Sequence, residues 1–257
     1  MPTRRAVLRT AAGALALLGA GCASRSPRPA GGSGEERDGA VLTARPAAPP
    51  PEGVPEPGTR PLGLPSGEAL MHVPAGLGTG PLPLAVSLHG AGGDADAGLA
   101  LLRPAADEHG LVVLAPGSAG ATWDAVGGGY GPDAAHVDRA LVEVFASVPV
   151  DPARTAVAGL SDGASYALGL GLANGRLFRR VVAFSPGFVP PAPRSGDPAV
   201  FVSHGVDDEV LPIDRTSRRI VPTLEEDGYD VTYREFPGGH AVPAEVVAAA
   251  VGWITAG

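Results

Sequence analysis

The sequence contains no lysine and a single cysteine, Cys22, among its 257 residues. Because every basic side chain apart from histidine is arginine, the chain cannot hold a P-loop lysine, a Schiff-base lysine or a Ser-Lys dyad. A single cysteine also excludes an internal disulfide. Basic residues are outnumbered by acidic ones, 19 to 27, and the formal net charge is −8. Since nucleic-acid binding depends on basic stripes that displace counterions, we expect no nucleic-acid partner.

Aromatic residues are also scarce, at 5% of the chain, although apolar residues as a whole make up 44%. The length is sufficient for one sizeable hydrophobic core and too short for two large domains. We therefore expect one folded domain.

The first residues have the pattern of an export signal. A basic stretch with twin arginines at residues 3–9 precedes an apolar stretch at residues 11–21 that is too short to span a bilayer comfortably. It ends at Cys22 in the context LGAGC, which is similar to a bacterial lipoprotein processing site, although glycine stands where leucine is usual. We expect residues 1–23 to be an export signal, with either lipid attachment at Cys22 or cleavage near Ala23. The protein is then a cell-envelope lipoprotein, attached to the membrane through the Cys22 lipid, or a secreted protein.

Residues 24–65 are rich in proline, glycine, alanine and charged side chains and show no sustained apolar period. Such a segment cannot bury enough apolar surface to offset the entropy lost on ordering. We expect residues 24–65 to be a disordered tether, either a spacer from a membrane or a plain leader. The folded domain is expected at residues 66–257.

Within that domain, short apolar runs alternate with helix-length patterns. We expect strands at residues 69–73, 84–89, 111–115, 155–159, 181–185, 200–204 and 231–236, and helices at residues 95–108, 134–147, 161–174, 214–226 and 243–254. Several strands are continuous runs of Val, Ala and Leu, as expected when both faces of a parallel sheet are covered. The alternation predicts an α/β fold, with a mostly parallel central sheet and helices on both faces. In such open sheets, functional residues gather at the carboxyl ends of the strands.

The most informative motif is the pentapeptide GLSDG at residues 159–163, which follows an apolar run and opens a helical pattern. In that context G-x-S-x-G forms a nucleophile elbow, a strained turn that exposes the serine. Glycines are needed there because side chains two residues before and after the serine would collide with the neighbouring helix and strand. Ser161 is therefore the candidate nucleophile.

Ser161 requires a base to accept its proton and an acid to orient that base. The turn after the strand at 200–204 is rich in acids, including Asp207 and Asp208. The strand at 231–236 is followed by a glycine-rich turn that ends in His240. This order along the chain, serine then acid then histidine, is that of the α/β-hydrolases.

The chain resembles the α/β-hydrolase superfamily and, within it, the phospholipase/carboxylesterase family of small serine esterases. The resemblance runs from about Leu70 to the C-terminus. It rests on LHGAGGD at 88–94, the elbow at Ser161, AFSPGF at 183–188, the segment 204–214, and FPGGHAVP at 236–243. It implies the α/β-hydrolase fold. Because no long insertion separates the strand at 181–185 from the acid, we expect little or no lid and an open site for short or soluble acyl groups.

The resemblance also implies roles for individual residues. The family pattern places the acid four residues after the histidine of H-G-x-x-D, at Asp208 rather than its neighbour Asp207, and the base at His240. The residue after a nucleophile, here Asp162, provides one backbone N–H of the oxyanion hole. In relatives with the same H-G-x-G-G loop, the residue after H-G, here Ala91, provides the second.

Other candidate residues have structural alternatives. Trp123 precedes a glycine-rich stretch and is the candidate substrate-binding residue, in an acyl or alcohol pocket; a core or rim position is the alternative. His89 and His204 end strands, and we expect them to fix loops by hydrogen bonds, since no metal-binding motif accompanies them. We expect no metal and no cofactor.

The expected function is that of a serine esterase, which hydrolyses small-molecule or lipid-like carboxylic esters through a Ser-His-Asp triad and an acyl-enzyme. A thioesterase, polyester depolymerase, feruloyl esterase or peptidase can use the same triad, because fold and triad do not specify the leaving group. The alternative of another class is a non-catalytic surface binding protein on a hydrolase scaffold. We expect a monomer or a small homo-oligomer.

Overall fold

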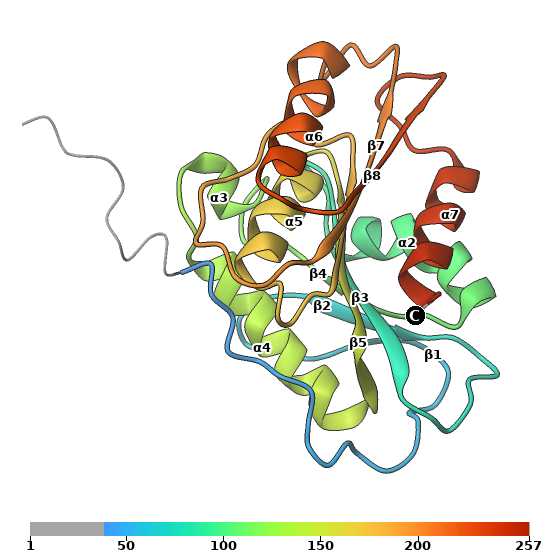
Figure 1. The fold of residues 1–257 in the computed structure, drawn as a ribbon. Helices are drawn as coiled ribbons and strands as arrows, with labels where there is room; N and C mark the ends of the chain where they lie inside the picture. Colours follow the sequence, from blue (N-terminus) through green and yellow to red (C-terminus); the bar gives the residue numbers. More distant parts are fainter. Residues whose placement is uncertain (1–38, 257) are drawn as a thin grey trace, which may run out of the picture. The chain divides into compact units, whose positions relative to one another are not determined.

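An eight-stranded sheet forms the centre of the protein in a computed structural model that describes residues 39–256 (Figure 1). Its strand order is β1-β2-β4-β3-β5-β6-β7-β8. β1 pairs with β2, and β2 with β4, in antiparallel fashion; all other pairs are parallel. The strands are β1 (Gly58–Pro61), β2 (Ala69–Val73), β3 (Leu82–Leu88), β4 (Val112–Pro116), β5 (Val150–Leu160), β6 (Arg180–Phe184), β7 (Ala199–Gly205) and β8 (Val231–Phe236).

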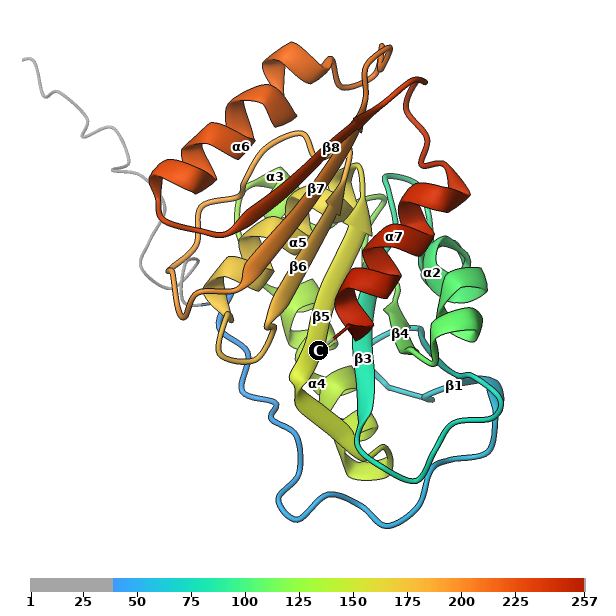
Figure 2. The same ribbon diagram turned by 45° about the vertical axis from the view of Figure 1, so that its right-hand side comes forward.

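Helices cover both faces of this sheet (Figure 2). One face packs against α2 (Ala95–His109) and α7 (Ala244–Thr255), and the other against α4 (Pro132–Ser147), α5 (Asp162–Ala173) and α6 (Ser217–Glu226). Successive residues of the central strands enter two different apolar clusters, one on each face. This explains why those strands are continuous apolar runs rather than alternating ones.

The predicted α/β architecture is confirmed, and every expected strand and helix is present within a few residues of its expected bounds. The expected helix at 214–226 is divided into a 3-10 turn, η1 (Ile213–Arg215), and α6. Two elements were not predicted, β1 and the short helix α3 (Asp124–Gly127). The β1 sequence, Gly-Thr-Arg-Pro, has no apolar pattern. It is a strand because its backbone pairs with the edge of β2 that β4 leaves unpaired.

The expectation of a disordered tether is wrong for residues 39–65. Ala40, Leu42 and Ala44 are at most 3% exposed and belong to the main apolar cluster. Their alternation with more exposed residues is a strand-like pattern of only five residues. The domain therefore begins well before residue 66.

Two polar side chains of the domain hold this segment. Asn174 accepts a hydrogen bond from the Leu42 N–H at 2.8 Å and donates one to the Ala40 carbonyl at 2.7 Å. The Asp138 carboxylate accepts the N–H groups of Thr43 and Ala44, both at 2.8 Å. Proline-rich composition did not reveal this docking because the partners lie far away in the sequence.

The expected export signal at residues 1–23 and the first part of the expected tether, up to residue 38, lie outside the described residues. Among residues 39–256, no helix combines the length and the hydropathy that crossing a bilayer requires.

We predict that Leu42→Ala lowers the free energy of unfolding of the full chain by about 2 to 4 kcal/mol, because it removes a buried side chain and leaves a cavity. The matched control is Val41→Ala, whose side chain is 49% exposed, and which should change that free energy by less than about 0.5 kcal/mol. Denaturant unfolding measures both. Equally small effects would mean that residues 39–44 detach from the domain in solution.

Candidate active site

The turn between β5 and α5 has a strained backbone at Ser161. This serine has φ 57° and ψ −117°, a conformation that residues other than glycine rarely adopt. Its N–H donates to the Phe184 carbonyl at 2.9 Å, and its own carbonyl accepts the Ser165 N–H at 3.0 Å. The backbone is thus fixed on both sides at the carboxyl edge of the sheet.

The two glycines of the motif allow this turn to pack closely. A Cβ atom at Gly159 would lie 2.3 Å from the backbone of Gly163. A Cβ atom at Gly163 would lie 2.4 Å from the carbonyl oxygens of Leu88 and His89, at the end of β3. Any larger residue at either position would therefore push the serine turn out of place.

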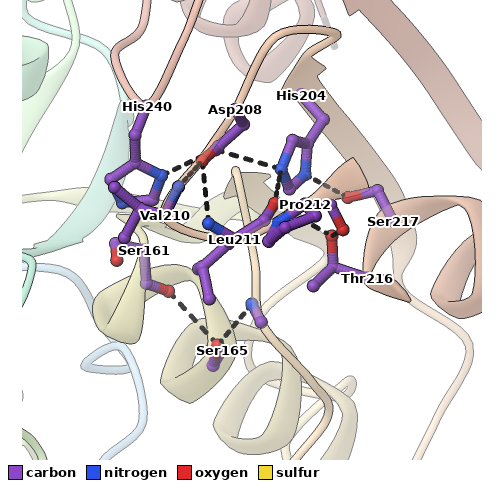
Figure 3. A network of polar contacts seen from close by, with 11 residues as sticks. Ser161, Ser165, His204, Asp208, Val210, Leu211, Pro212, Thr216, Ser217 and His240 are labelled. Atoms are coloured by element: carbon purple, nitrogen blue, oxygen red, sulfur yellow. Dashed lines mark hydrogen bonds and ion pairs between the residues drawn. The ribbon is translucent and has the colours of Figure 1, made fainter. Parts of the chain in front are cut away.

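Asp208 and His240 reach the same edge from the loops after β7 and β8. His240 Nδ1 lies 2.7 Å from Asp208 Oδ2. The neighbouring Asp207 is exposed, whereas Asp208 is 5% exposed. In Figure 3, Ser161 lies beneath His240 in the view, and Asp208 lies beside the same ring. The structure therefore places Asp208, and not Asp207, against the histidine.

The Asp208 carboxylate is held in its ionised form. Its other oxygen, Oδ1, accepts the N–H groups of Val210 at 2.9 Å and Leu211 at 2.8 Å. Burial alone would raise the pKa of Asp208, but the Leu211 N–H and the His240 ring outweigh it and hold the pKa below its usual value. An ionised acceptor at Nδ1 keeps the proton of a neutral imidazole on that nitrogen and leaves Nε2 as the basic atom.

Ala91 and Asp162 lie on the two loops that flank the serine. A Cβ atom at Gly90 would lie 3.6 Å from the Ser161 Cβ, so the loop after β3 passes beside the serine. Asp162 is the first residue of α5, where backbone N–H groups have no partner within the helix. Within residues 39–256, the N–H groups of Gly92 and Gly93 donate to carbonyls, whereas that of Ala91 has no acceptor. Both predicted donors are therefore available.

The prediction that Trp123 lines the substrate pocket is wrong, and the alternative of a core position is correct. Its side chain is 0% exposed, and its Nε1–H donates to the His89 carbonyl at 2.9 Å. Its ring centroid lies 4.8 Å from that of His89 and 5.0 Å from that of Tyr166. Trp123 therefore supports the loop after β3 from the core: its apolar ring packs there, and its single N–H group binds the loop.

His89 fixes the loops around the serine, as expected. Its Nδ1 donates to the Gly90 carbonyl at 2.8 Å, and its Nε2 accepts the Ser118 N–H at 3.0 Å. Within residues 39–256, no three His, Cys, Asp or Glu side chains gather as a metal site would require.

Sequence reasoning missed two hydroxyl groups that support the site. Thr122 Oγ1 donates to Asp162 Oδ2 at 2.6 Å, which ties the loop after β4 to the start of α5. Ser165 Oγ accepts the Gly187 N–H at 2.9 Å, which ties α5 to the loop after β6. Threonine and serine occur throughout the chain, and no local pattern distinguishes these two.

Part of the chain matches the model of a known protein family. Residues 133–256 match the family model described as Phospholipase/Carboxylesterase. This part of the chain is similar to that family, and the fold is that of the α/β-hydrolases. A search of curated proteins gave no match.

Solved structures resemble this α/β-hydrolase over most of its length. The esterase PE8 is 25% identical with a TM-score of 0.58, and the alignment covers 72% of this chain and 95% of that one. A carboxylesterase from Bacillus cereus is 21% identical, with a TM-score of 0.55 and coverage of 72% and 92%. An S-formylglutathione hydrolase from Staphylococcus aureus is 16% identical, with a TM-score of 0.61 and coverage of 78% and 98%. The last two show the shared fold, and the family as a whole is one of serine hydrolases of the esterase type.

We predict that Gly163→Ala lowers the free energy of unfolding of this hydrolase by about 3 kcal/mol or prevents folding, because the new methyl group would overlap two carbonyl oxygens. Gly127→Ala is the matched control: a Cβ atom there meets no atom within 4 Å, and the change should stay below about 0.5 kcal/mol. Thermal and denaturant unfolding provide the comparison. A Gly163→Ala protein as stable as wild type would contradict the close packing of the turn.

Proposed function

We propose that this hydrolase cleaves carboxylic esters through an acyl-enzyme formed on Ser161. The observation that carries the proposal is the strained turn that presents Ser161 at the edge where His240 meets an ionised Asp208. His240 Nε2 accepts the serine proton while Oγ attacks the ester carbonyl carbon, and then donates that proton to the leaving alcohol. Water attacks the acyl-enzyme by the same route and releases the acid. Asp208 orients His240 and stabilises its protonated form.

The tetrahedral intermediate of each half-reaction carries a negative oxygen. We propose that the Ala91 and Asp162 N–H groups bind it, since both lie beside Ser161 and both lack an acceptor within the described residues. Loss of one such donor costs about 2.7 to 4 kcal/mol of transition-state stabilisation in enzymes of this kind.

The loops around the site favour short or soluble acyl groups. The connection between β6 and β7, residues 185–198, contains neither helix nor strand and so provides no helical lid. Phe188, Val206 and Val210, in the loops after β6 and β7, are 40%, 40% and 65% exposed. These separate apolar side chains can contact a small acyl group. They do not form a continuous apolar surface against which a long acyl chain could be buried.

The test is hydrolysis of p-nitrophenyl esters from acetate to palmitate by the full chain and by Ser161→Ala. We expect the highest kcat/KM for short chains, and a loss of about 10⁴-fold or more in Ser161→Ala because the nucleophile is removed. A thioester with the same acyl group separates esterase from thioesterase activity. A preference for palmitate would contradict the open site. If wild type neither turns over nor reacts at Ser161 with a fluorophosphonate, the scaffold is a binding protein instead.

The two neighbouring carboxylates provide a matched pair of variants. Asp208→Asn should lower kcat by about 10³- to 10⁴-fold, because an amide cannot hold His240 in the required tautomer. Asp207→Asn, one residue away and exposed, should keep kcat within about twofold of wild type. Steady-state kinetics on the best short ester decides between them, and equal losses would remove Asp208 from the proposed triad.

A further inference from the structure

A second histidine contacts the acid of the proposed triad. His204, near the end of β7, is 0% exposed. Its Nε2 lies 3.1 Å from Asp208 Oδ2 and 2.8 Å from the Leu211 carbonyl oxygen. Asp208 Oδ2 is also the atom that contacts His240 Nδ1. Figure 3 shows the two rings on either side of the Asp208 carboxylate.

The neighbours of His204 determine which of its nitrogens carries the proton. A carbonyl and an ionised carboxylate only accept hydrogen bonds, so Nε2 must carry a proton, which it donates to the Leu211 carbonyl while Asp208 Oδ2 lies 3.1 Å away. Nδ1 is then an acceptor, and the Ser217 hydroxyl, 2.7 Å away, donates to it. Ser217 is the first residue of α6 and is completely buried. The hydroxyl and the ring therefore form a chain that ends on the acid.

His204 is neutral in this environment. Burial lowers its pKa, and the Leu211 carbonyl and Asp208 offset this only in part. A neutral donor stabilises the Asp208 charge without competing with His240 as a second cation. Among the described residues, two further titratable groups lie near His204: His240, whose charge also lowers the pKa of His204, and the cross-strand partner Glu235 on β8, which is paired with Arg218 at 2.7 Å.

We propose that His204, fixed by Ser217, is a positioning residue that holds Asp208 in the orientation that receives His240 and takes up part of the charge on Oδ2. The inference rests on the proposed triad. Val210 and Leu211 hold only Oδ1. His204 is thus the one group besides His240 that reaches Oδ2 within the described part of the chain.

A purely structural role makes a different prediction. His204 also stabilises the turn at residues 206–212, because its Nε2–H donates a hydrogen bond to the Leu211 carbonyl. If that were its whole contribution, its loss would lower stability and leave the kinetics of the folded fraction unchanged. The distinguishing readouts are therefore kcat against KM and the pH profile.

The decisive variant is His204→Leu, which fills similar volume and removes both nitrogens. We expect kcat on a short p-nitrophenyl ester to fall by about tenfold to a hundredfold, the effect of losing a hydrogen bond to a charged group, with KM within about twofold because His204 does not reach the substrate. The acid limb of the kcat/KM profile should move to higher pH. Without the His204 N–H, the negative charge on Asp208 Oδ2 is less shared and attracts a positive charge at the neighbouring ring more strongly.

Two further variants sharpen the test. His204→Gln can place an amide N–H near the Nε2 position and should restore most of kcat and the wild-type acid limb. Ser203→Ala is the control, since Ser203 is the buried neighbour on β7 and its hydroxyl has no partner among residues 39–256. It should keep both kcat and the acid limb unchanged.

If His204→Leu does not fold, Ser217→Ala decides, because it removes only the hydroxyl that fixes the ring. We then expect kcat to fall by about twofold to tenfold, the effect of one neutral hydrogen bond. A folded His204→Leu, or failing that Ser217→Ala, with wild-type kcat and an unmoved acid limb would overturn the positioning role. Ser161→Ala is assayed alongside. If hydrolysis depends on Ser161 but the His204 variants do not alter it, only this inference is contradicted. If the wild-type protein shows no Ser161-dependent hydrolysis, the proposed function is contradicted as well.

Discussion

The parallel register of β5 to β8 positions the loops that form the proposed site. Leu160 pairs with Phe184, and Gly205 pairs with Phe236, so β5 to β8 end at a common edge. The serine turn, the acid loop and the histidine loop start from those ends. The hydrogen bond from His240 to Asp208 then joins the last two loops across 32 positions of sequence. A shift in register would move the two loops apart and separate these side chains.

Strain at the serine is compatible with a stable fold because the turn is over-determined. A positive φ at a residue other than glycine, as at Ser161, costs about 1 to 3 kcal/mol. Here the cost is offset by the Ser161 hydrogen bond to Phe184 and by close contact of the two motif glycines with β3 and α5. The backbone of the turn is therefore held by contacts within the fold.

The loop after β3 is supported by Trp123 and by two neighbouring carboxylates, the buried Asp133 and the half-buried Asp124. The Trp123 Nε1–H donates a hydrogen bond to the His89 carbonyl. The two carboxylates in turn accept hydrogen bonds from groups around Trp123. Asp133 accepts the N–H groups of Ala119 and Asp124, and the Asp124 carboxylate accepts the Tyr166 hydroxyl. Burial raises the pKa of Asp124, with the charge of Asp133 adding to it. Ring contacts and hydrogen bonds among these residues thus support the proposed oxyanion loop.

The α/β layering, the nucleophile turn at Ser161 and the segments that hold the acid and the base follow from the sequence alone, because each depends on residues close together along the chain. Four other points required the three-dimensional structure. Trp123 faces the core, residues 39–44 dock, His204 shares Asp208 with His240, and Asp208 rather than Asp207 turns inward, as the family resemblance had implied. Burial and hydrogen-bond partners decide such points, and Leu42 meets Asn174 across 132 positions that no local pattern connects.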